Sequence, residues 1–396
     1  MTAAIIQVDT GTGRRAVRLP DYLGPAEEER AVEAAYRWIK QLRRLSVDGQ
    51  PLRRRFTFRG DSLWWFAELY LHKTEVIRDL FRTTAALEQL VQRECPVELS
   101  VLSGDRLVRG LAPQIARAHG VRYVGKGGFG STRVRAVRLN LRAIALTYAA
   151  LASRLRPGRR LSATSSAEIV AFVHRAFWRG EGSDGSAESY IGPVLTALEH
   201  RLAPGAVRYV AVGPASNFAA RRWWHPLRHL DALAGLEPVE AYAPLGALRA
   251  STGVWRQRHA MRRALWGSAE IRQHAVVNRI DWWPAVREEL AGVALLQWPW
   301  SARTMDEAGA ALDALHPRVA LTYAEAGGWG RALMLECRRR AVRSVGLQHG
   351  FIYRHWLNYL HEPDEMSPDA VSAGDSGFPR PDLTLLFDGY AAQHLA

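Results

Sequence analysis

The stretch that decides the fold class is RVALTYAEAGGWGRALMLECRRRAVRSVGLQHG, residues 318–350. Its apolar run at 318–323 predicts a buried strand, residues 328–341 predict a helix, and RSVGL at 343–347 predicts a second strand. Strand, helix and strand in this order form a βαβ unit, whose two strands are parallel and commonly adjacent. The stretch therefore predicts an α/β fold of the Rossmann-like kind.

Candidate catalytic side chains follow both strands of this unit. Glu325 comes just after the first strand, and Gln348-His349-Gly350 comes just after the second. The carboxyl ends of parallel strands meet at one edge of a sheet, with neighbouring strands about 4.8 Å apart, and ligands bind at this edge in open α/β sheets. A carboxylate and an imidazole there can deprotonate a hydroxyl group. We therefore predict Glu325 and His349 as catalytic residues.

Glycines between the strands predict an anion site. Gly327, Gly328 and Gly330 lie at the start of the helix, where free N–H groups favour a phosphate, and we add Gln348 and Gly350 to this substrate-binding set. A simpler interpretation is open for each catalytic residue, since Glu325 can complement the helix dipole and His349 can bond a loop.

Alternating strands and helices also occur upstream. The segments 97–102, 105–120 and 121–125 predict strand, helix and strand, and the glycine-rich loop that follows suits an anion, which makes Lys126, Gly127 and Gly128 candidate phosphate-binding residues. The loop fits neither of the common nucleotide-binding glycine motifs. Further predicted strands are 168–174, 207–213 and 238–243, and a helix is predicted at 189–202.

The predicted organisation has four parts. Residues 1–55 form a leader with one helix, and residues 56–361 form a Rossmann-like domain with a helical insert at about 245–315. The Pro-, Gly- and Ser-rich stretch 362–381 predicts a linker. Residues 382–396 resemble the start of a second domain, so we expect a truncated chain.

Two further groups of polar residues lie outside the βαβ unit. Asp61 precedes Trp64-Trp65 and is a candidate base or acceptor contact, although a helix cap explains it equally well. The histidines and acids near His361 match no metal-binding spacing, and we predict no metal site.

Composition limits the class of protein. The chain of 396 residues is 48% hydrophobic and 23% charged, with two cysteines far apart, as expected for a cytoplasmic globular protein. Its net charge of +14 comes mostly from dispersed arginines, which makes nucleic acid an unlikely partner and leaves peripheral contact with an anionic inner membrane.

Three segments resemble one family. LMLECRRRAVRSVGLQHGFI (333–352) is similar to the stretch ending in Gln-His-Gly in bacterial GT-B glycosyltransferases of surface and capsule polysaccharide synthesis, which are related to the CDP-glycerol glycerophosphotransferases. DSLWWFAELYL (61–71) and DLTLLFDGYAAQHL (382–395) resemble other segments of these proteins. The resemblance implies transfer from a nucleotide-sugar donor to a cell-envelope glycan or lipid-linked acceptor, in a cleft between two Rossmann-like domains and without a tightly bound cofactor.

Alternatives stay open at this point. A polyol-phosphate transferase of the CDP-glycerol type and a UDP-sugar 2-epimerase share the architecture. The net charge alone supports a non-catalytic binder of nucleic acid or another polyanion. In GT-B enzymes the second domain holds most of the donor, so a fragment without that domain is expected to be inactive.

Overall fold

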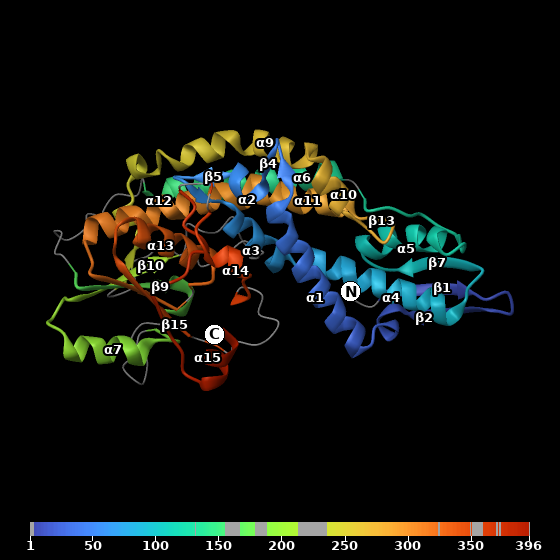
Figure 1. The fold of residues 1–396 in the computed structure, drawn as a ribbon, viewed down its shortest axis with the longest axis horizontal. Helices are drawn as coiled ribbons and strands as arrows, with labels where there is room; N and C mark the ends of the chain where they lie inside the picture. The colour runs from blue at the N-terminus through green and yellow to red at the C-terminus, as the bar shows by residue number, and fades with distance from the viewer. Residues whose placement is uncertain are drawn as a thin grey trace. The chain divides into compact units, whose positions relative to one another are not determined.

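The computed structural model describes residues 4–130, 132–154, 167–178, 188–212, 236–323, 325–348, 350, 359–369, 371 and 374–395 (Figure 1). Its contacts divide the chain into two units. Unit 1 comprises Met1–Phe56, Ala67–Leu139 and His259–Ala294, and unit 2 comprises Thr57–Phe66, Asn140–Arg258 and Leu295–Ala396. Each unit is therefore assembled from segments far apart in the sequence.

Unit 2 contains a six-stranded parallel sheet. Its strands lie in the order β11-β10-β9-β14-β15-β16, and every neighbouring pair is parallel. Chain order therefore runs outward in both directions from the adjacent central pair β9 and β14, which is the strand order of a doubly wound Rossmann-like sheet. The strands are β9 (Ile169–His174), β10 (Val207–Val212), β11 (Glu237–Pro238), β14 (Val319–Thr322), β15 (Arg343–Leu347) and β16 (Leu383–Leu385).

Helices cover both faces of this sheet, as parallel sheets require. One face packs against α8 (Val239–Tyr242), α12 (Trp298–Leu315) and α13 (Gly328–Arg339), with Phe172 and Leu333 in the shared core. The other face packs against α7 (Gly192–Arg201) through Leu195. In Figure 1, α12 and α13 lie on the side of the sheet opposite α7.

The predicted βαβ unit is confirmed. Thr322 of β14 pairs with Gly346 of β15 in a parallel register, and α13 connects the two strands. The strand predicted at 238–243 is wrong except for its first residue, because Val239–Tyr242 is helical. The segment predicted to begin a second domain also differs, since its strand β16 joins β15 in the same sheet. Asp382 fixes this pairing by accepting hydrogen bonds from the backbone N–H (2.8 Å) and the hydroxyl (2.9 Å) of Ser344.

Unit 1 has a separate four-stranded sheet in the order β2-β1-β7-β8. The predicted leader thus contributes a hairpin as well as a helix, and the strands predicted at 97–102 and 121–125 lie in this sheet instead of the Rossmann-like one.

Asp105 caps the start of helix α5 (Arg106–Ala118) by accepting hydrogen bonds from the N–H groups of Leu107 (2.8 Å) and Val108 (3.1 Å). The elements are β1 (Ile5–Asp9), β2 (Arg14–Arg18), η1 (Leu19–Tyr22), α1 (Pro25–Gln41), η2 (Leu42–Arg44), β3 (Ser46–Val47), β4 (Gln50–Pro51), α2 (Leu52–Arg55), α4 (Val76–Glu94), β7 (Glu98–Ser103), α5 (Arg106–Ala118), β8 (Arg122–Tyr123), α10 (Ala269–His274), β12 (Val276–Val277), β13 (Ile280–Asp281) and α11 (Trp283–Gly292).

Other elements belong to unit 2 or contribute residues to both units. The helical region predicted at 245–315 is confirmed as helical, with the short β12–β13 hairpin inside it. These elements are β5 (Thr57–Phe58), β6 (Asp61–Ser62), α3 (Trp64–Thr74), α6 (Thr132–Arg154), η3 (Arg175–Phe177), η5 (Leu245–Leu248), α9 (Ser251–Gly267), the π-helix η6 (Val293–Gln297), α14 (Pro363–Met366) and α15 (Gly389–Leu395). Among the described residues, none of the helices is long and apolar enough to cross a membrane.

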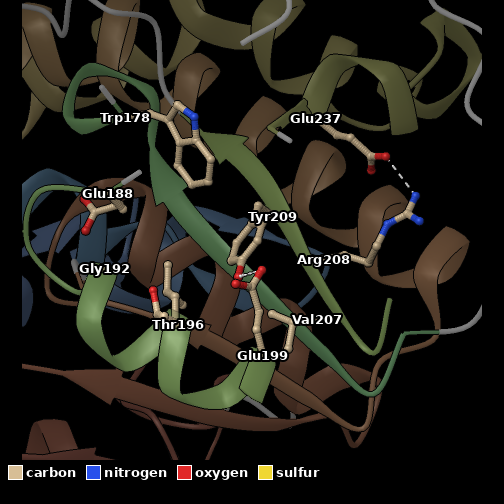
Figure 2. A pocket seen from close by; sticks show the side chains of 10 residues that line it. Trp178, Glu188, Gly192, Thr196, Glu199, Val207, Arg208, Tyr209 and Glu237 are labelled. Atoms are coloured by element: carbon tan, nitrogen blue, oxygen red, sulfur yellow. Dashed lines mark hydrogen bonds and ion pairs between the residues drawn. The ribbon is translucent and has the colours of Figure 1, made fainter. Parts of the chain in front are cut away.

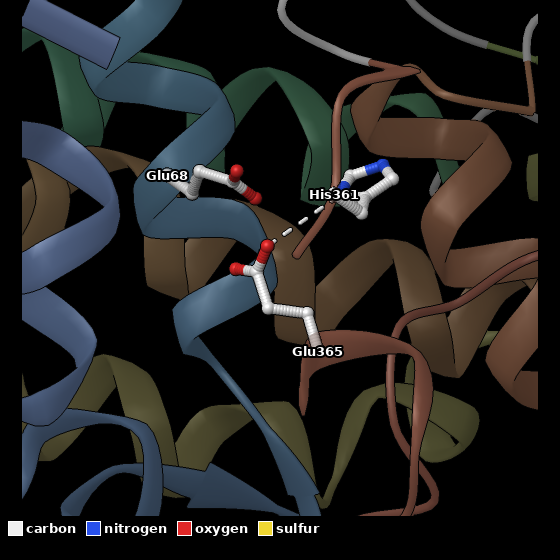
Figure 3. A group of neighbouring side chains, drawn as sticks. All are labelled: Glu68, His361 and Glu365. Carbon is white, nitrogen blue, oxygen red and sulfur yellow. Dashed lines mark ion pairs between the residues drawn. The ribbon is translucent and has the colours of Figure 1, made fainter. Parts of the chain in front are cut away.

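The stretch predicted as a linker, 362–381, is packed where it is described. Glu365 is fully buried and accepts a hydrogen bond from the N–H of Glu362 (2.9 Å), which closes a capping box around α14. The His361 Nδ1 lies 3.9 Å from Glu365, as Figure 3 shows. Gly374 lies so close to Gly60 that a Cβ on it would be 2.5 Å from the Gly60 Cα. The two glycines therefore let this segment pack directly on the β5–β6 hairpin.

Candidate functional site

The candidate site is the carboxyl edge of the unit 2 sheet at β9, β14 and β15. The direction of chain progression reverses between β9 and β14, and open α/β sheets bind ligands at the carboxyl ends of strands at such a point. His174 ends β9, Tyr323 and Glu325 follow β14, and Gln348 follows β15. The sheet therefore gathers the polar groups of three adjacent strands along one edge.

Glu325 is a buried acid at this edge, and its pKa is shifted far from its ordinary value. It is only 4% exposed, and its Oε1 accepts a hydrogen bond of 3.0 Å from the Tyr359 hydroxyl. Its other carboxylate oxygen is buried and has no hydrogen-bond partner among the described residues. Burial raises the pKa of Glu325 to about 7, against the smaller lowering effects of its own backbone N–H and of Tyr359. The carboxyl group thus changes charge near neutral pH.

Gly346 makes room for this carboxyl group on β15. A Cβ at Gly346 would lie 3.0 Å from the Cγ and 3.1 Å from the Cδ of Glu325. Any larger residue there would push the acid away from its position. The glycine of RSVGL is therefore part of the site, which the sequence pattern alone did not indicate.

An aromatic group lies beside Glu325 at the same edge. Tyr323 is 1% exposed, and its hydroxyl oxygen accepts a hydrogen bond of 2.9 Å from the backbone N–H of His174. The Tyr323 ring lies 5.7 Å from that of Tyr190, which in turn contacts Phe177 edge-on at 4.6 Å between ring centroids. Burial and the nearby Glu188 charge raise the pKa of Tyr323, so its hydroxyl stays protonated. Sequence reasoning missed these residues because they reach the edge from three separate segments.

Gln348 fixes the turn after β15. Its side-chain amide donates to the carbonyl of Gly350 (2.9 Å), and its Oε1 accepts from the backbone N–H of Phe387 (3.1 Å). Both polar ends of Gln348 therefore hold protein backbone, which indicates a positioning role. His349, the predicted partner of Glu325, lies outside the described residues.

The start of α13 carries the predicted glycines. Gly327 is the N-cap, with φ −76° and ψ 169°, and no side chain caps the helix. Gly328 and Gly330 occupy the first turn, and the carbonyl of Gly327 accepts from the N–H of Arg331 at 2.8 Å. This geometry leaves first-turn N–H groups for an anion.

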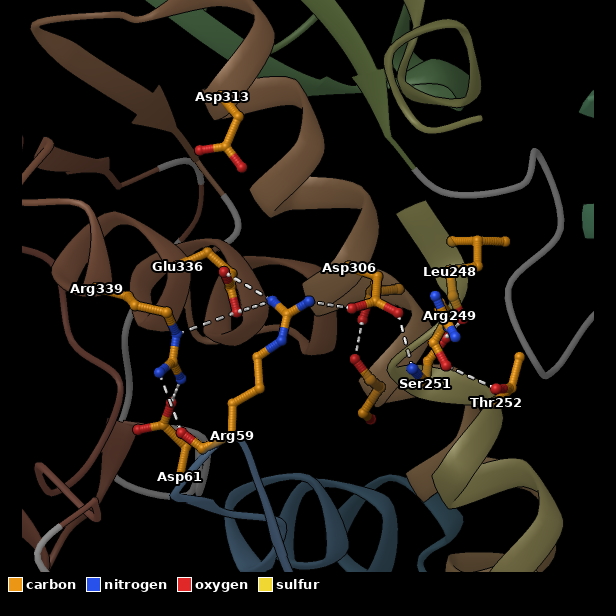
Figure 4. Close-up of polar contacts among 12 residues, drawn as sticks. Arg59, Asp61, Leu248, Arg249, Ser251, Thr252, Asp306, Asp313, Glu336 and Arg339 are labelled. Carbon is orange, nitrogen blue, oxygen red and sulfur yellow. Dashed lines mark hydrogen bonds and ion pairs between the residues drawn. The ribbon is translucent and has the colours of Figure 1, made fainter. Parts of the chain in front are cut away.

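Asp61 belongs to an ion-pair network, shown in Figure 4. It pairs with Arg339, while Arg59 donates to the fully buried Glu336 at 3.1 and 3.2 Å and also pairs with Asp306. Burial raises the pKa of Asp61 to about 7, and the positive charge of Arg339 opposes this shift. These contacts are those of a structural ion-pair network, no described contact joins Asp61 to Glu325, and a role of Asp61 as a base stays a prediction.

The predicted phosphate-binding loop lies in unit 1. A Cβ on Gly127 would lie 2.6 Å from the Cγ of Pro113 in α5, and the N–H of Gly128 donates to the carbonyl of Arg109 at 2.9 Å. The glycines therefore allow the loop to pack on α5. Lys126 is exposed.

Unit 2 also contains a cavity of about 410 Å³ between α7 and β10 (Figure 2). Trp178 and Tyr209 line it with their rings, 5.4 Å apart between centroids, and Glu199 accepts a hydrogen bond of 2.5 Å from the Tyr209 hydroxyl. On the β11 side, Arg208 lies 2.8 Å from Glu237. Sequence reasoning did not single out this cavity, whose lining residues come from separate elements.

Comparisons of the chain with protein-family models, with curated proteins and with solved structures found no match.

Proposed function

We propose that this chain is a glycosyltransferase of the GT-B type, which moves a sugar from a nucleotide-sugar donor to a cell-envelope or capsular glycan acceptor. The observation that carries the proposal is Glu325, a buried acid with a pKa of about 7 at the carboxyl edge where the strand order reverses. A general base works best when its pKa lies near the working pH.

The proposed step is a displacement at the anomeric carbon of the donor. The acceptor hydroxyl gives its proton to the unpartnered oxygen of Glu325, and its oxygen forms the new bond to the anomeric carbon. The bond from that carbon to the diphosphate oxygen breaks, and the nucleoside diphosphate leaves with the electron pair. The first-turn N–H groups of α13 are suited to stabilise the leaving phosphate. His349 stays a predicted second catalytic residue in this scheme.

The proposal is tested by donor turnover. The full-length protein, with the donor-holding second domain that the resemblance implies, is mixed with a panel of UDP-, GDP- and TDP-sugars and with CDP-glycerol, and release of the free nucleotide is measured. We expect release from one class of nucleotide sugar, and at least a hundredfold loss in Glu325→Gln. Glu168→Gln removes an exposed carboxylate of the same unit and serves as the matched control, which should retain turnover.

Other outcomes identify the rivals. Turnover of CDP-glycerol alone indicates a polyol-phosphate transferase, and release of a free epimerised sugar without an acceptor indicates a 2-epimerase. Full turnover in Glu325→Gln would show that Glu325 is not the catalytic base. Steeply salt-dependent DNA binding with no donor turnover would favour the non-catalytic polyanion binder.

A further inference from the structure

Helix α6 exposes a continuous apolar stripe. Its unit 2 part carries four exposed apolar residues at spacings of three and four, and two more continue the same face toward the start of the helix. The exposed fractions are Val134 51%, Val137 58%, Leu141 55%, Ile144 44%, Tyr148 67% and Leu151 39%. Residues at these spacings lie on one side of a helix.

The opposite side of α6 is fixed to unit 2. Ala143 is buried there, and the carbonyl of Leu146 accepts a hydrogen bond of 3.4 Å from Arg303 of α12. Arg154 at the end of the helix donates to the carbonyl of Ala243 at 2.7 Å and forms an ion pair with Glu307. The exposed stripe therefore faces away from the helix side that packs on the protein.

A stripe of this kind is typical of a contact surface. Contiguous exposed apolar surface on soluble proteins commonly marks a protein or membrane contact. The sequence of α6 contains no acidic residue and five arginines, of which Arg154 is buried in its ion pair with Glu307 and Arg138 beside the stripe is exposed. A second copy of α6 would bring like charges together along the seam, whereas anionic lipid headgroups complement them.

We propose that the α6 stripe docks on an anionic bilayer surface, with its apolar side chains at the headgroup boundary and Arg138 among lipid phosphates. The helix lies along the surface, in the manner of other basic amphipathic helices. This inference does not depend on the proposed glycosyl transfer, and it adds a lipid partner whichever reaction unit 2 performs.

The test is flotation of the full chain with vesicles of phosphatidylcholine that contain increasing phosphatidylglycerol. We expect the wild-type chain to bind anionic vesicles and to be released by salt. Replacing Leu141, Ile144 and Tyr148 together with Gln should weaken binding by at least about tenfold, because three partly buried apolar contacts are lost. Arg138→Gln should weaken binding about fivefold.

A matched triple variant carries the same change elsewhere in unit 2. Val194, Val371 and Leu383 are exposed by 41%, 73% and 52%, and replacing them with Gln should leave vesicle binding unchanged. Circular dichroism checks that both triple variants keep the wild-type helix content. Failure of the wild-type chain to bind anionic vesicles, equal loss in both triple variants, or a stripe-dependent dimer in ultracentrifugation would overturn the proposal.

Discussion

Replacing Glu325 with Gln should stabilise unit 2 at alkaline pH. The folded-state pKa of Glu325 is about 7, above its ordinary value of 4.5, so the folded protein binds this proton more tightly than the unfolded chain. Such a group contributes most stability at low pH, and that contribution is lost as the pH rises from 4.5 through 7. Gln keeps the shape of the side chain and an oxygen for the Tyr359 hydroxyl, but it carries no charge.

The size of the effect follows from the two pKa values. Ionising Glu325 costs the folded state about 0.8 kcal/mol at pH 5 and about 3.3 kcal/mol at pH 8, if its pKa moves from 4.5 to 7. The difference in unfolding free energy between Glu325→Gln and wild type should therefore rise by about 2.5 kcal/mol between these pH values. Guanidinium denaturation, followed by tryptophan fluorescence at pH 5, 6, 7 and 8, measures it.

Comparing the two proteins across pH isolates the contribution of Glu325 ionisation to the unfolding free energy. Any pH-independent cost of the buried Gln amide adds only a constant to the difference between the two proteins, and the titration of Asp61 affects both proteins alike. A constant difference between Glu325→Gln and wild type from pH 5 to 8 would refute the reasoning, because it would mean that Glu325 ionises in the fold as easily as in the unfolded chain.

Three further changes test the surrounding structure. Arg59→Met should destabilise unit 2 by about 2–3 kcal/mol in denaturant, because Glu336 is fully buried and loses one of its arginine partners. Gly346→Ala should lower both donor turnover and the melting temperature, at a cost of about 1–2 kcal/mol, since its methyl group would meet the carboxyl group of Glu325 at 3.0–3.1 Å. Asp313→Asn should have the opposite pH dependence from Glu325→Gln, because hydrogen bonds from Arg340 lower the pKa of Asp313. The stability that Asp313 contributes is therefore present above its unfolded-state pKa and is lost as the pH falls through its folded-state pKa. Because the Asp313 side chain is 62% exposed, that loss should stay below about 1 kcal/mol when melting is compared at pH 7 and pH 3.

The part of the fold predicted best is the part encoded by local pattern. The segment from Val319 to Leu347 alternates strand, helix and strand without interruption, so its parallel pairing follows from a short crossover. For the same reason the position of Glu325 past the end of β14 is as predicted. Its pairing with His349 stays a prediction.

The rest depends on contacts between distant segments. The register of β9 beside β14 joins residues about 150 positions apart, which no local periodicity specifies. The stretch 362–381 has the composition of a linker, yet Gly374 packs on Gly60 and its backbone is fixed by Asp375, whose Oδ1 accepts from the N–H of Gly377 at 3.0 Å. Asp61 precedes an aromatic pair, but its partner Arg339 lies far downstream.

That last separation affects how the protein folds as it is made. Asp61 is synthesised 278 residues before Arg339, and Arg59 is made 277 residues before Glu336. At about 5–20 residues per second, the hairpin that carries them waits roughly 14–56 s for its partners to leave the ribosome. During that interval the apolar residues beside it, Trp64 and Trp65, have no completed core to enter. A nascent chain arrested before residue 330 should therefore expose this hairpin to proteases and chaperones.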